Sequence, residues 1–437
     1  MKRLDSRSTN CGNDDSRFYK LKEVRLKFLR FHCLDRHHCA VQYHHLVDGI
    51  IKRFEDANPH IKIESTIMRN WYQLMHILNK KLHTDETPDI FHTCGGGILE
   101  DLSNAGLVYD LTHELVNGWR QDFVPASLQP LRFHGKDFAI PLEQGCIFVW
   151  YNKSIFKDFG FSIPKTFNDL LYICRELARK GIVPFTVGNG ERWPGAFFFS
   201  HLFHRIGGEE VFVCDFTKAP NYDHIRDSFI AAASKLLELV DAGAFHKDCN
   251  TTDYYGQRMM LIEGRAAMQI NGNRLLNYLL VEGPAIIDRL DIFSFPLVDG
   301  SRGKTTTLFG GSLATYAISA RSKHKREAVK FLRSLTDRQA ARDVIFNMGD
   351  IPALNHVPFS EYPSAVHARM AEELSKAENL QVHYFKYLPP HAAGVYLNVV
   401  ARLFEKEITP EEAFETVEKA LAAKTGNNMN KLGGIEI

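Results

Sequence analysis

The hydrophobic pattern at the start of the chain alternates between the repeat of a strand and the repeat of a helix. Alternating apolar and polar residues over 24–28 and 61–64 predict strands, because successive strand side chains point to opposite faces. Helical spacing over 46–54 and 74–82 predicts a helix after each strand. A third short strand follows at 88–91. This order predicts an α/β domain with a largely parallel sheet.

The pattern changes in the next part of the chain. Residues 146–151 form an apolar run that is too continuous for a strand with one face in solvent, and it predicts a buried strand passing between two lobes. Thr166 fits the N-cap of a helix over 167–179, and Gly181 fits its C-terminal stop. Later elements predicted in the same way are a helix running into a strand over 258–272, strands over 290–296 and 312–319, and a last helix over 410–423.

Composition narrows the class of protein further. The chain has 437 residues, of which 53 are basic and 52 acidic, for a formal charge of +1. At roughly 100–200 residues per domain, this length indicates two or three lobes. The near-neutral balance gives no electrostatic reason to expect nucleic acid or an anionic membrane surface as a partner. The longest apolar runs fall short of the roughly 20 residues that a membrane helix needs.

Common catalytic and phosphate-binding motifs are absent from the sequence. We find no Walker loop, no GxSxG elbow, no HExxH helix and no acidic pair placed as in a glycosidase. We therefore expect no catalytic residues and no cofactor. One triple-glycine run, 95–97, follows a predicted strand, and it is either a plain tight turn or a place where a ligand approaches the backbone at Gly96.

Residues 31–45 are the compositional outlier, with five of the chain's twenty histidines and two of its eight cysteines. Thiolate and imidazole are ligands that zinc prefers, but the order fits no standard zinc-finger spacing. Three interpretations stay open: a loop that happens to be rich in histidine, a zinc site, or a segment read out of frame. We favour the loop and expect no metal.

Aromatic residues give the strongest indication of a ligand. Trp193 lies in a glycine-rich polar loop, where an indole can pack against the C–H face of a sugar while amides and carboxylates bind its hydroxyls. Anchoring of the loop is the alternative. Asn70 and Trp71 form a second, less specific cluster. Glu143 follows the predicted lobe crossing, where it either accepts hydrogen bonds from hydroxyls or is an ordinary surface residue.

The order of short motifs between about residues 24 and 423 resembles the extracellular carbohydrate-binding proteins that serve ABC-type importers. Each motif is weak alone, and their joint order and spacing is specific. The motifs lie at 51–64, 87–91, 105–111, 150–156, 160–166, 264–268 and 271–273.

This resemblance implies a fold of the periplasmic-binding-protein type, in which two α/β lobes, each a mostly parallel sheet flanked by helices, hold a ligand in the cleft between them. A hinge would close over the ligand without covalent chemistry. The N-terminal lobe would comprise 23–142 and 290–335, and the C-terminal lobe 143–289 and 336–437. Residues 1–22 would be a flexible tail.

The resemblance also implies a set of ligand-binding residues. Trp193 matches the stacking tryptophan and Glu143 the acidic residue after the first crossing, while Gly310 and Gly311 resemble the loop that returns to the first lobe. Asn271 and Asn273 match the polar loop that follows the strand motif at 264–268. The family usually places Trp at Arg274 or its neighbour Asn273, and often an aromatic residue at Cys94.

The implied function is a monomeric receptor that captures a sugar or oligosaccharide and delivers it to an ABC permease, with no nucleic acid involved. The alternatives are a glycosidase-like enzyme that uses Glu143 and a degenerate paralogue that binds nothing. Members of the family are exported, so we expect an extracytoplasmic location, in the periplasm or as a cell-surface lipoprotein. No leader is visible, although Cys11 and the polar residues after it resemble the mature start of a lipoprotein; an unmodified tail is the favoured interpretation.

Overall fold

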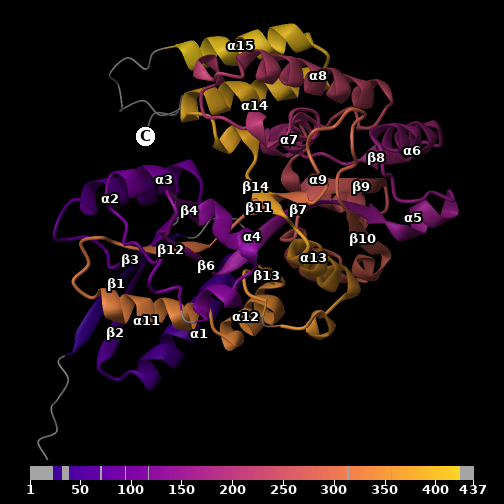
Figure 1. Cartoon of the computed structure of the whole chain (residues 1–437). Coiled ribbons are helices and arrows are strands. Elements are labelled where there is room, and N and C mark those ends of the chain that lie inside the picture. The colour runs from indigo at the N-terminus through magenta and orange to yellow at the C-terminus, as the bar shows by residue number, and fades with distance from the viewer. Residues whose placement is uncertain are drawn as a thin grey trace, which may run out of the picture.

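The computed structural model describes residues 23–31, 39–68, 71–93, 95–116, 118–312, 314–355 and 357–423. Within them the chain forms two lobes, each built around a sheet with helices on its faces (Figure 1). The first lobe, in indigo at the lower left of Figure 1, contains a five-stranded sheet, and the second lobe contains a seven-stranded sheet. The expected two-lobed α/β class is confirmed. Among the described helices, none has both the length and the apolar character needed to cross a membrane.

The strands of the first lobe, in sheet order, are β2 (Ile61–Met68), β1 (Val24–Phe31), β3 (Ile90–Thr93), β12 (Thr315–Ile318) and β6 (Ile140–Pro141). β1 runs parallel to β2 and β3, as the sequence pattern predicts, and β12 runs antiparallel to β3 and β6. The helices of this lobe are α1 (Cys39–Ala57), α2 (Trp71–Lys81), α3 (Gly97–Asn104), α11 (Lys325–Leu335) and α12 (Arg338–Asp343). A short hairpin is formed by β4 (Arg132–Phe133) and β5 (Lys136–Asp137).

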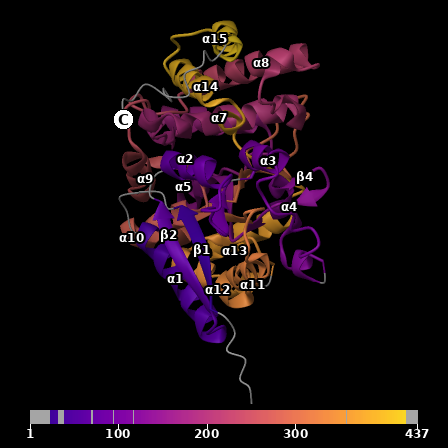
Figure 2. The same cartoon turned by 90° about the vertical axis from the view of Figure 1, so that its left-hand side faces the viewer.

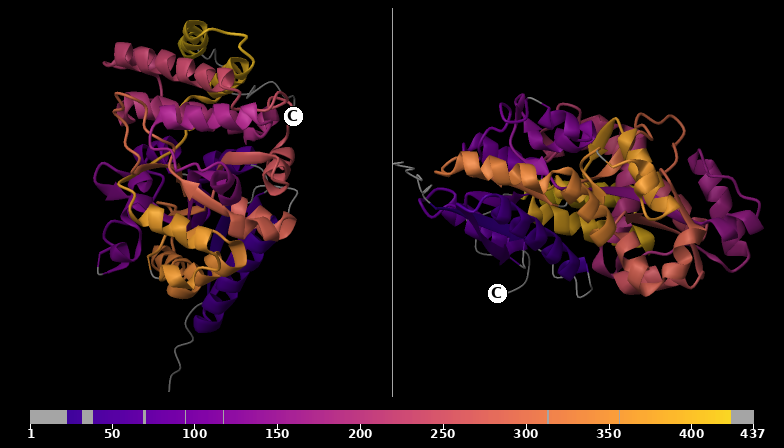
Figure 3. Two further views of the ribbon diagram at one scale, coloured as in Figure 1. Left: turned by 90° about the vertical axis from the view of Figure 1, so that its right-hand side faces the viewer. Right: turned by 90° about the horizontal axis from the view of Figure 1, so that it is seen from below.

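Aromatic contacts join the sheet of the first lobe to helices from both ends of the chain. Phe28 on β1 lies edge-on to Tyr316 on β12, at 5.2 Å between ring centroids, and to Phe331 on α11, at 5.4 Å. Phe331 also meets Phe54 on α1 at 5.1 Å. Figures 1 and 3 show the orange α11 and α12 beside the indigo segment of α1. Late residues of the sequence therefore complete the core of the first lobe.

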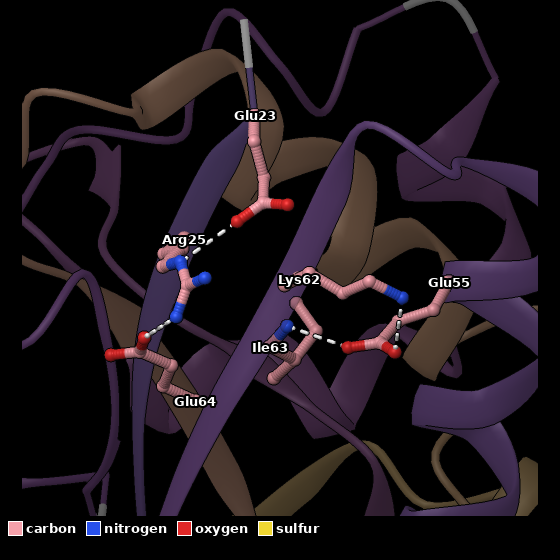
Figure 4. Close-up of polar contacts among 6 residues, drawn as sticks. All are labelled: Glu23, Arg25, Glu55, Lys62, Ile63 and Glu64. Carbon is pink, nitrogen blue, oxygen red and sulfur yellow. Dashed lines mark hydrogen bonds and ion pairs between the residues drawn. The ribbon is translucent and has the colours of Figure 1, made fainter.

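β2 is the edge strand of the described first sheet, and charged side chains cover it (Figure 4). Arg25 on β1 lies between Glu23 and Glu64, at 2.8 and 3.2 Å. Glu55 near the end of α1 forms an ion pair with Lys62 at 3.1 Å, and its other oxygen accepts a hydrogen bond from the backbone N–H of Ile63 at 2.8 Å. A side chain thus satisfies one backbone donor of the edge strand.

The strands of the second lobe, in sheet order, are β14 (Asn379–Gln381), β11 (Thr307–Gly311), β7 (Glu143–Asn152), β9 (Ala266–Gly272) and β8 (Val183–Phe185), while β10 (Leu290–Phe293) and β13 (Ile351–Pro352) also pair with β7. β7 is buried along nearly its whole length, which confirms the strand expected at 146–151. β7 is antiparallel to β9, β10, β11 and β13, so this sheet is mixed where a mostly parallel one was expected.

The helices of the second lobe are α5 (Lys153–Asp158), α6 (Phe167–Arg179), α7 (Trp193–Gly207), α8 (Tyr222–Asp241), α9 (Tyr254–Ile262), α10 (Leu275–Glu282), α13 (Ala365–Ser375), α14 (Pro390–Phe404) and α15 (Pro410–Ala422). Figure 2 shows α7, α8, α14 and α15 stacked at one end of this lobe, while α13 packs against β10 and β13. The predicted cap of α6 is present: the Thr166 hydroxyl accepts from the Asp169 N–H at 3.1 Å, and the Asp169 carboxylate accepts from the Thr166 N–H at 2.9 Å.

Two lobe boundaries differ from the expectation. Residues 290–335 were assigned to the first lobe, but β10 and β11 both pair with β7, so only the part from β12 onward lies in that lobe. Residues 336–437 were assigned to the second lobe, but apolar residues of α12 and of the turn Val344–Met348 pack in the first core beside α1. The apolar pattern predicts that a segment is buried, but not which of two cores buries it.

Candidate ligand-binding site

Three chain segments run between the lobes and lie side by side. The first joins β6 to β7 at Leu142, and the second joins β11 to β12. The third, residues 349–355, follows the turn Val344–Met348 of the first lobe and includes β13. The N–H of Leu142 donates to the carbonyl of Ala314 at 2.9 Å, and the N–H of Ala353 donates to the carbonyl of Leu142 at 3.2 Å. These three lobe connections place Glu143, Gly310 and Gly311 at the junction of the two sheets.

Charged and amide side chains form a largely buried group at these connections, which we call the crossing cluster: Glu143, Asn273, Arg274 and Asp350. The Nη2 of Arg274 lies 2.5 Å from Glu143 Oε1, and its Nε lies 3.4 Å from Asp350 Oδ2. The carboxylate side chains are only 1% exposed, whereas the Arg274 side chain is 37% exposed. Glu143 is therefore not the surface residue that the sequence offered as one alternative: Arg274 binds its Oε1, and its Oε2 is buried without a hydrogen-bond partner among the described residues.

Burial and nearby charge shift the proton affinity of groups in and around the cluster. Burial raises the pKa of Asp350 well above its usual value, the neighbouring Glu143 raises it further, and Arg274 opposes both. Burial lowers the pKa of His92, on β3 of the first lobe, to about 3, with a contribution from the positive charge of Arg274. His92 is therefore neutral at physiological pH. The guanidinium of Arg274 is the cation that Glu143 and Asp350 share.

The two predicted asparagines have different roles in the structure. The side chain of Asn273 bonds internally, since its Oδ1 accepts from the Cys146 N–H at 2.8 Å and its Nδ2 donates to Asp350 at 2.8 Å and to the Gln144 carbonyl at 3.3 Å. Asn271 lies on β9, and its Oδ1 accepts from the hydroxyl of Tyr254 at 3.0 Å. Its Nδ2 is buried and has no hydrogen-bond partner among the described residues. Asn271 is thus the better candidate for a ligand contact, and Asn273 is a positioning residue.

Trp193 begins α7 and does not lie inside a loop as the sequence suggested. Its ring is half-buried and contacts Phe197 at 5.1 Å and Tyr254 at 5.0 Å between centroids. Its Nε1 donates to Glu191 at 3.1 Å, and the other carboxylate oxygen of Glu191 accepts from the Tyr254 N–H at 3.4 Å. Trp193 and Tyr254 therefore form an aromatic corner, which the Tyr254 hydroxyl joins to Asn271.

A buried arginine holds Tyr254 in place. The guanidinium of Arg258 lies over the Tyr254 ring at 4.6 Å and over the Tyr278 ring at 4.0 Å, and it makes two 2.8 Å bonds to Glu282. Sequence reasoning missed Tyr254, Glu191 and Asp350, because nothing in their local pattern separates them from surface residues. Arg274 did carry a signal, since it stands near the position where the family usually has Trp.

The remaining predicted residues have mainly structural explanations or are not described. Gly96 precedes α3 with a φ of 77°, and its N–H donates to the Pro130 carbonyl at 2.8 Å, which fits the tight-turn interpretation. A Cβ on Gly310 would lie 1.9 Å from the Gly145 carbonyl oxygen, so close pairing of β11 with β7 requires glycine there. Asn70, Cys94 and residues 32–38 lie outside the described residues, and Trp71 starts α2. Over the described ranges, no group of three or more His, Cys, Asp or Glu side chains is arranged to hold a metal.

A groove of about 560 Å³ lies elsewhere on the second lobe. Tyr151, Asp291 and Arg369 are among its lining residues, and none of the predicted ligand-binding residues lines it. The groove is therefore separate from the aromatic corner and the crossing cluster.

Comparison with known proteins identifies the family. Over residues 46–342, more than half of the chain, the sequence matches the model of the family described as bacterial extracellular solute-binding protein. The chain is 23% identical to the "Multiple sugar-binding protein" of Streptococcus mutans serotype c, over 67% of this chain and 68% of that protein. It is 26% identical to a "Probable sugar-binding periplasmic protein" of Mesorhizobium japonicum, over 74% of this chain and 76% of that protein.

A solved structure supports the same assignment at the level of the fold. The chain superposes on a "Chitin oligosaccharide binding protein" with a TM-score of 0.74 at 20% identity, covering 91% of this chain and 98% of that one. The family match and the two-lobed architecture show that this chain belongs to the bacterial extracellular solute-binding proteins.

Proposed function

We propose that this protein is a sugar or oligosaccharide receptor that captures its ligand between the two lobes and delivers it to an ABC permease outside the cytoplasm. The observation that carries the proposal is the aromatic corner of Trp193 and Tyr254, joined to Asn271 beside the lobe connections. The names of the relatives, which describe a multiple sugar-binding protein and a sugar-binding periplasmic protein, support this ligand class.

The chemistry of the corner suits a saccharide. Aromatic faces pack against the C–H groups of a sugar ring, and amide and carboxylate groups bind its hydroxyls. Glu191 and Asn271 border the two rings with such groups. Ligand binding would shift the equilibrium between open and closed lobes by its difference in affinity for the two states.

We propose binding without catalysis. A glycosidase needs two carboxyl groups about 5–10 Å apart on either side of the glycosidic bond. Glu143 and Asp350 are neighbouring carboxyl groups, but both side chains are only 1% exposed and lie against Arg274, and neither faces open solvent where a substrate could reach it. Monomeric action and lipid attachment at Cys11, which lies outside the described residues, stay predictions.

Isothermal calorimetry against maltotriose, raffinose, xylotriose and chitotriose tests the proposal. At least one sugar should bind, and Trp193→Ala should weaken that binding tenfold or more, equivalent to about 1.4 kcal/mol. Tyr172→Ala is the control, because Tyr172 is exposed on α6 and lies outside the aromatic corner. If none of the sugars binds, or Trp193→Ala binds as tightly as the control, the proposed site is wrong.

A further inference from the structure

The crossing cluster lies where two lobe connections meet the sheet of the second lobe. Glu143 starts β7 directly after the first lobe connection, and Asp350 precedes β13 in the third. The two strands that follow are paired, since Pro352 lies opposite Glu143. Arg274 follows β9 in the second lobe and contacts both carboxyl groups. One guanidinium therefore ties two lobe connections to the same turn of the second lobe.

Neighbouring contacts strengthen this attachment. Asn273 bonds Asp350 through its Nδ2 and the Cys146 N–H through its Oδ1, so the same turn also holds the start of β7. The Nε2 of His367 on α13 lies 3.1 Å from the Asp350 carbonyl oxygen. By contrast, Gly349, immediately before Asp350, has a φ of 64°, in the left-handed region that favours glycine.

We propose that Glu143, Arg274 and Asp350 anchor two of the three lobe connections to the second lobe, and so fix where the lobes bend relative to each other. Bending then lies in the residues that lead from the cluster into the first lobe: Leu142 before Glu143, Gly349 before Asp350, and the segment after Pro352, where Ala353 and Leu354 pack in the first core. This role concerns the regulation of the site proposed above and rests on that function only for its effect on ligand affinity.

The charge balance of the cluster makes the anchor sensitive to protons. Two buried carboxyl groups face one guanidinium, and the raised pKa of Asp350 means that the folded protein retains a proton there. The other titratable groups packed nearby are His367 and His92, and burial lowers their pKa values to about 4 and about 3, so they stay neutral. Raising the pH removes the proton from Asp350 and leaves a second buried negative charge beside Glu143.

Hydrogen exchange of the ligand-free protein, measured by mass spectrometry, tests the anchor without any sugar. Arg274→Met should raise exchange at least tenfold in peptides covering 143–152 and 350–355, relative to the rest of the second lobe. Arg30→Met is the control, because Arg30 forms an ion pair of the same length, 2.5 Å, with Asp48, but both residues belong to the first lobe. This control should leave exchange at the connections unchanged even if it lowers stability.

Asp350→Asn is the second variant, because its amide imitates the protonated carboxyl group. It should keep slow exchange at the connections. A carboxyl group whose pKa is raised by folding contributes stability that is lost as the pH rises above its unfolded pKa of about 4, so from there upward wild-type stability to urea should fall more steeply with pH than that of Asp350→Asn. The proposal is overturned if Arg274→Met loses protection evenly over the second lobe, or if the two pH profiles coincide. Neither result would bear on sugar binding, which calorimetry measures separately.

Discussion

At the scale of single residues, the packing of the lobe junction depends on a glycine, because a side chain at that position would not fit. Gly310 allows the backbones of β11 and β7 to approach so closely that a Cβ would lie 1.9 Å from a carbonyl oxygen. Since the clash is with backbone, no side-chain rotation relieves it.

Gly310→Ala should therefore destabilise the protein by about 1–3 kcal/mol, the usual cost of overpacking a buried site. Urea unfolding measures the change. Gly394→Ala is the matched control, because Gly394 lies within α14 with nothing within 4 Å of the new Cβ, and alanine there should be neutral or stabilise by about 0.5–1 kcal/mol. Equal stabilities for the two variants would show that the strands can separate without cost.

Some residues of the candidate site could be recognised from the sequence, and others only from their contacts in the fold. The pattern identified Trp193 because an indole in a glycine-rich segment is conspicuous, whereas Tyr254 needs the contact with Arg258 before its role is visible. The ion pair that occupies Glu143 was not predictable, since Arg274 and Asp350 lie far from it in sequence and meet it only through the fold.

At the scale of elements, aromatic rings connect the candidate site to the strands at the lobe junction. Phe197 on α7 contacts Trp193 on one side and stacks on His383 at 4.1 Å on the other, and His383 stacks on Phe309 of β11 at 5.2 Å. Both ring nitrogens of His383 are buried without a hydrogen-bond partner in the part of the chain that the structure describes. The packing of α7 against β11 and β14 therefore requires a neutral imidazole.

Burial lowers the pKa of His383 well below its usual value. Because the unfolded chain binds a proton at a pKa near 6.5 and the folded chain does not, stability should fall as the pH drops below about 6.5. At pH 5 this histidine alone should cost about 2 kcal/mol relative to pH 7. His383→Phe should remove that part of the loss in urea unfolding at the two pH values; an unchanged pH dependence would mean that the ring is not held neutral.

Elements were the level at which sequence reasoning worked best. The first strands and helices, the buried β7 and the capped start of α6 all follow from local patterns, because periodicity and capping are encoded within a few residues. Partner choice among strands is not local. For that reason the pattern located β10 but not its pairing with β7.

At the scale of the whole molecule, the order of motifs predicted the two lobes, and the family match agrees with it. The predicted lobe boundaries were wrong where the chain returns to the first lobe after residue 335. α12 and the turn after it look like any amphipathic segment, and only the space left beside α1 determines that they complete the first core.

The side chain that covers the edge of the first sheet has a consequence for how copies of this protein meet. An edge strand with free backbone donors is a template for pairing with another chain. Glu55 occupies the Ile63 N–H and so withholds one donor from such pairing. Glu55→Ala should therefore show concentration-dependent association in sedimentation velocity, whereas Glu55→Gln, which keeps an acceptor oxygen, should not. One side chain at the end of α1 thus makes the edge of the first sheet a poorer template for a second copy of the chain.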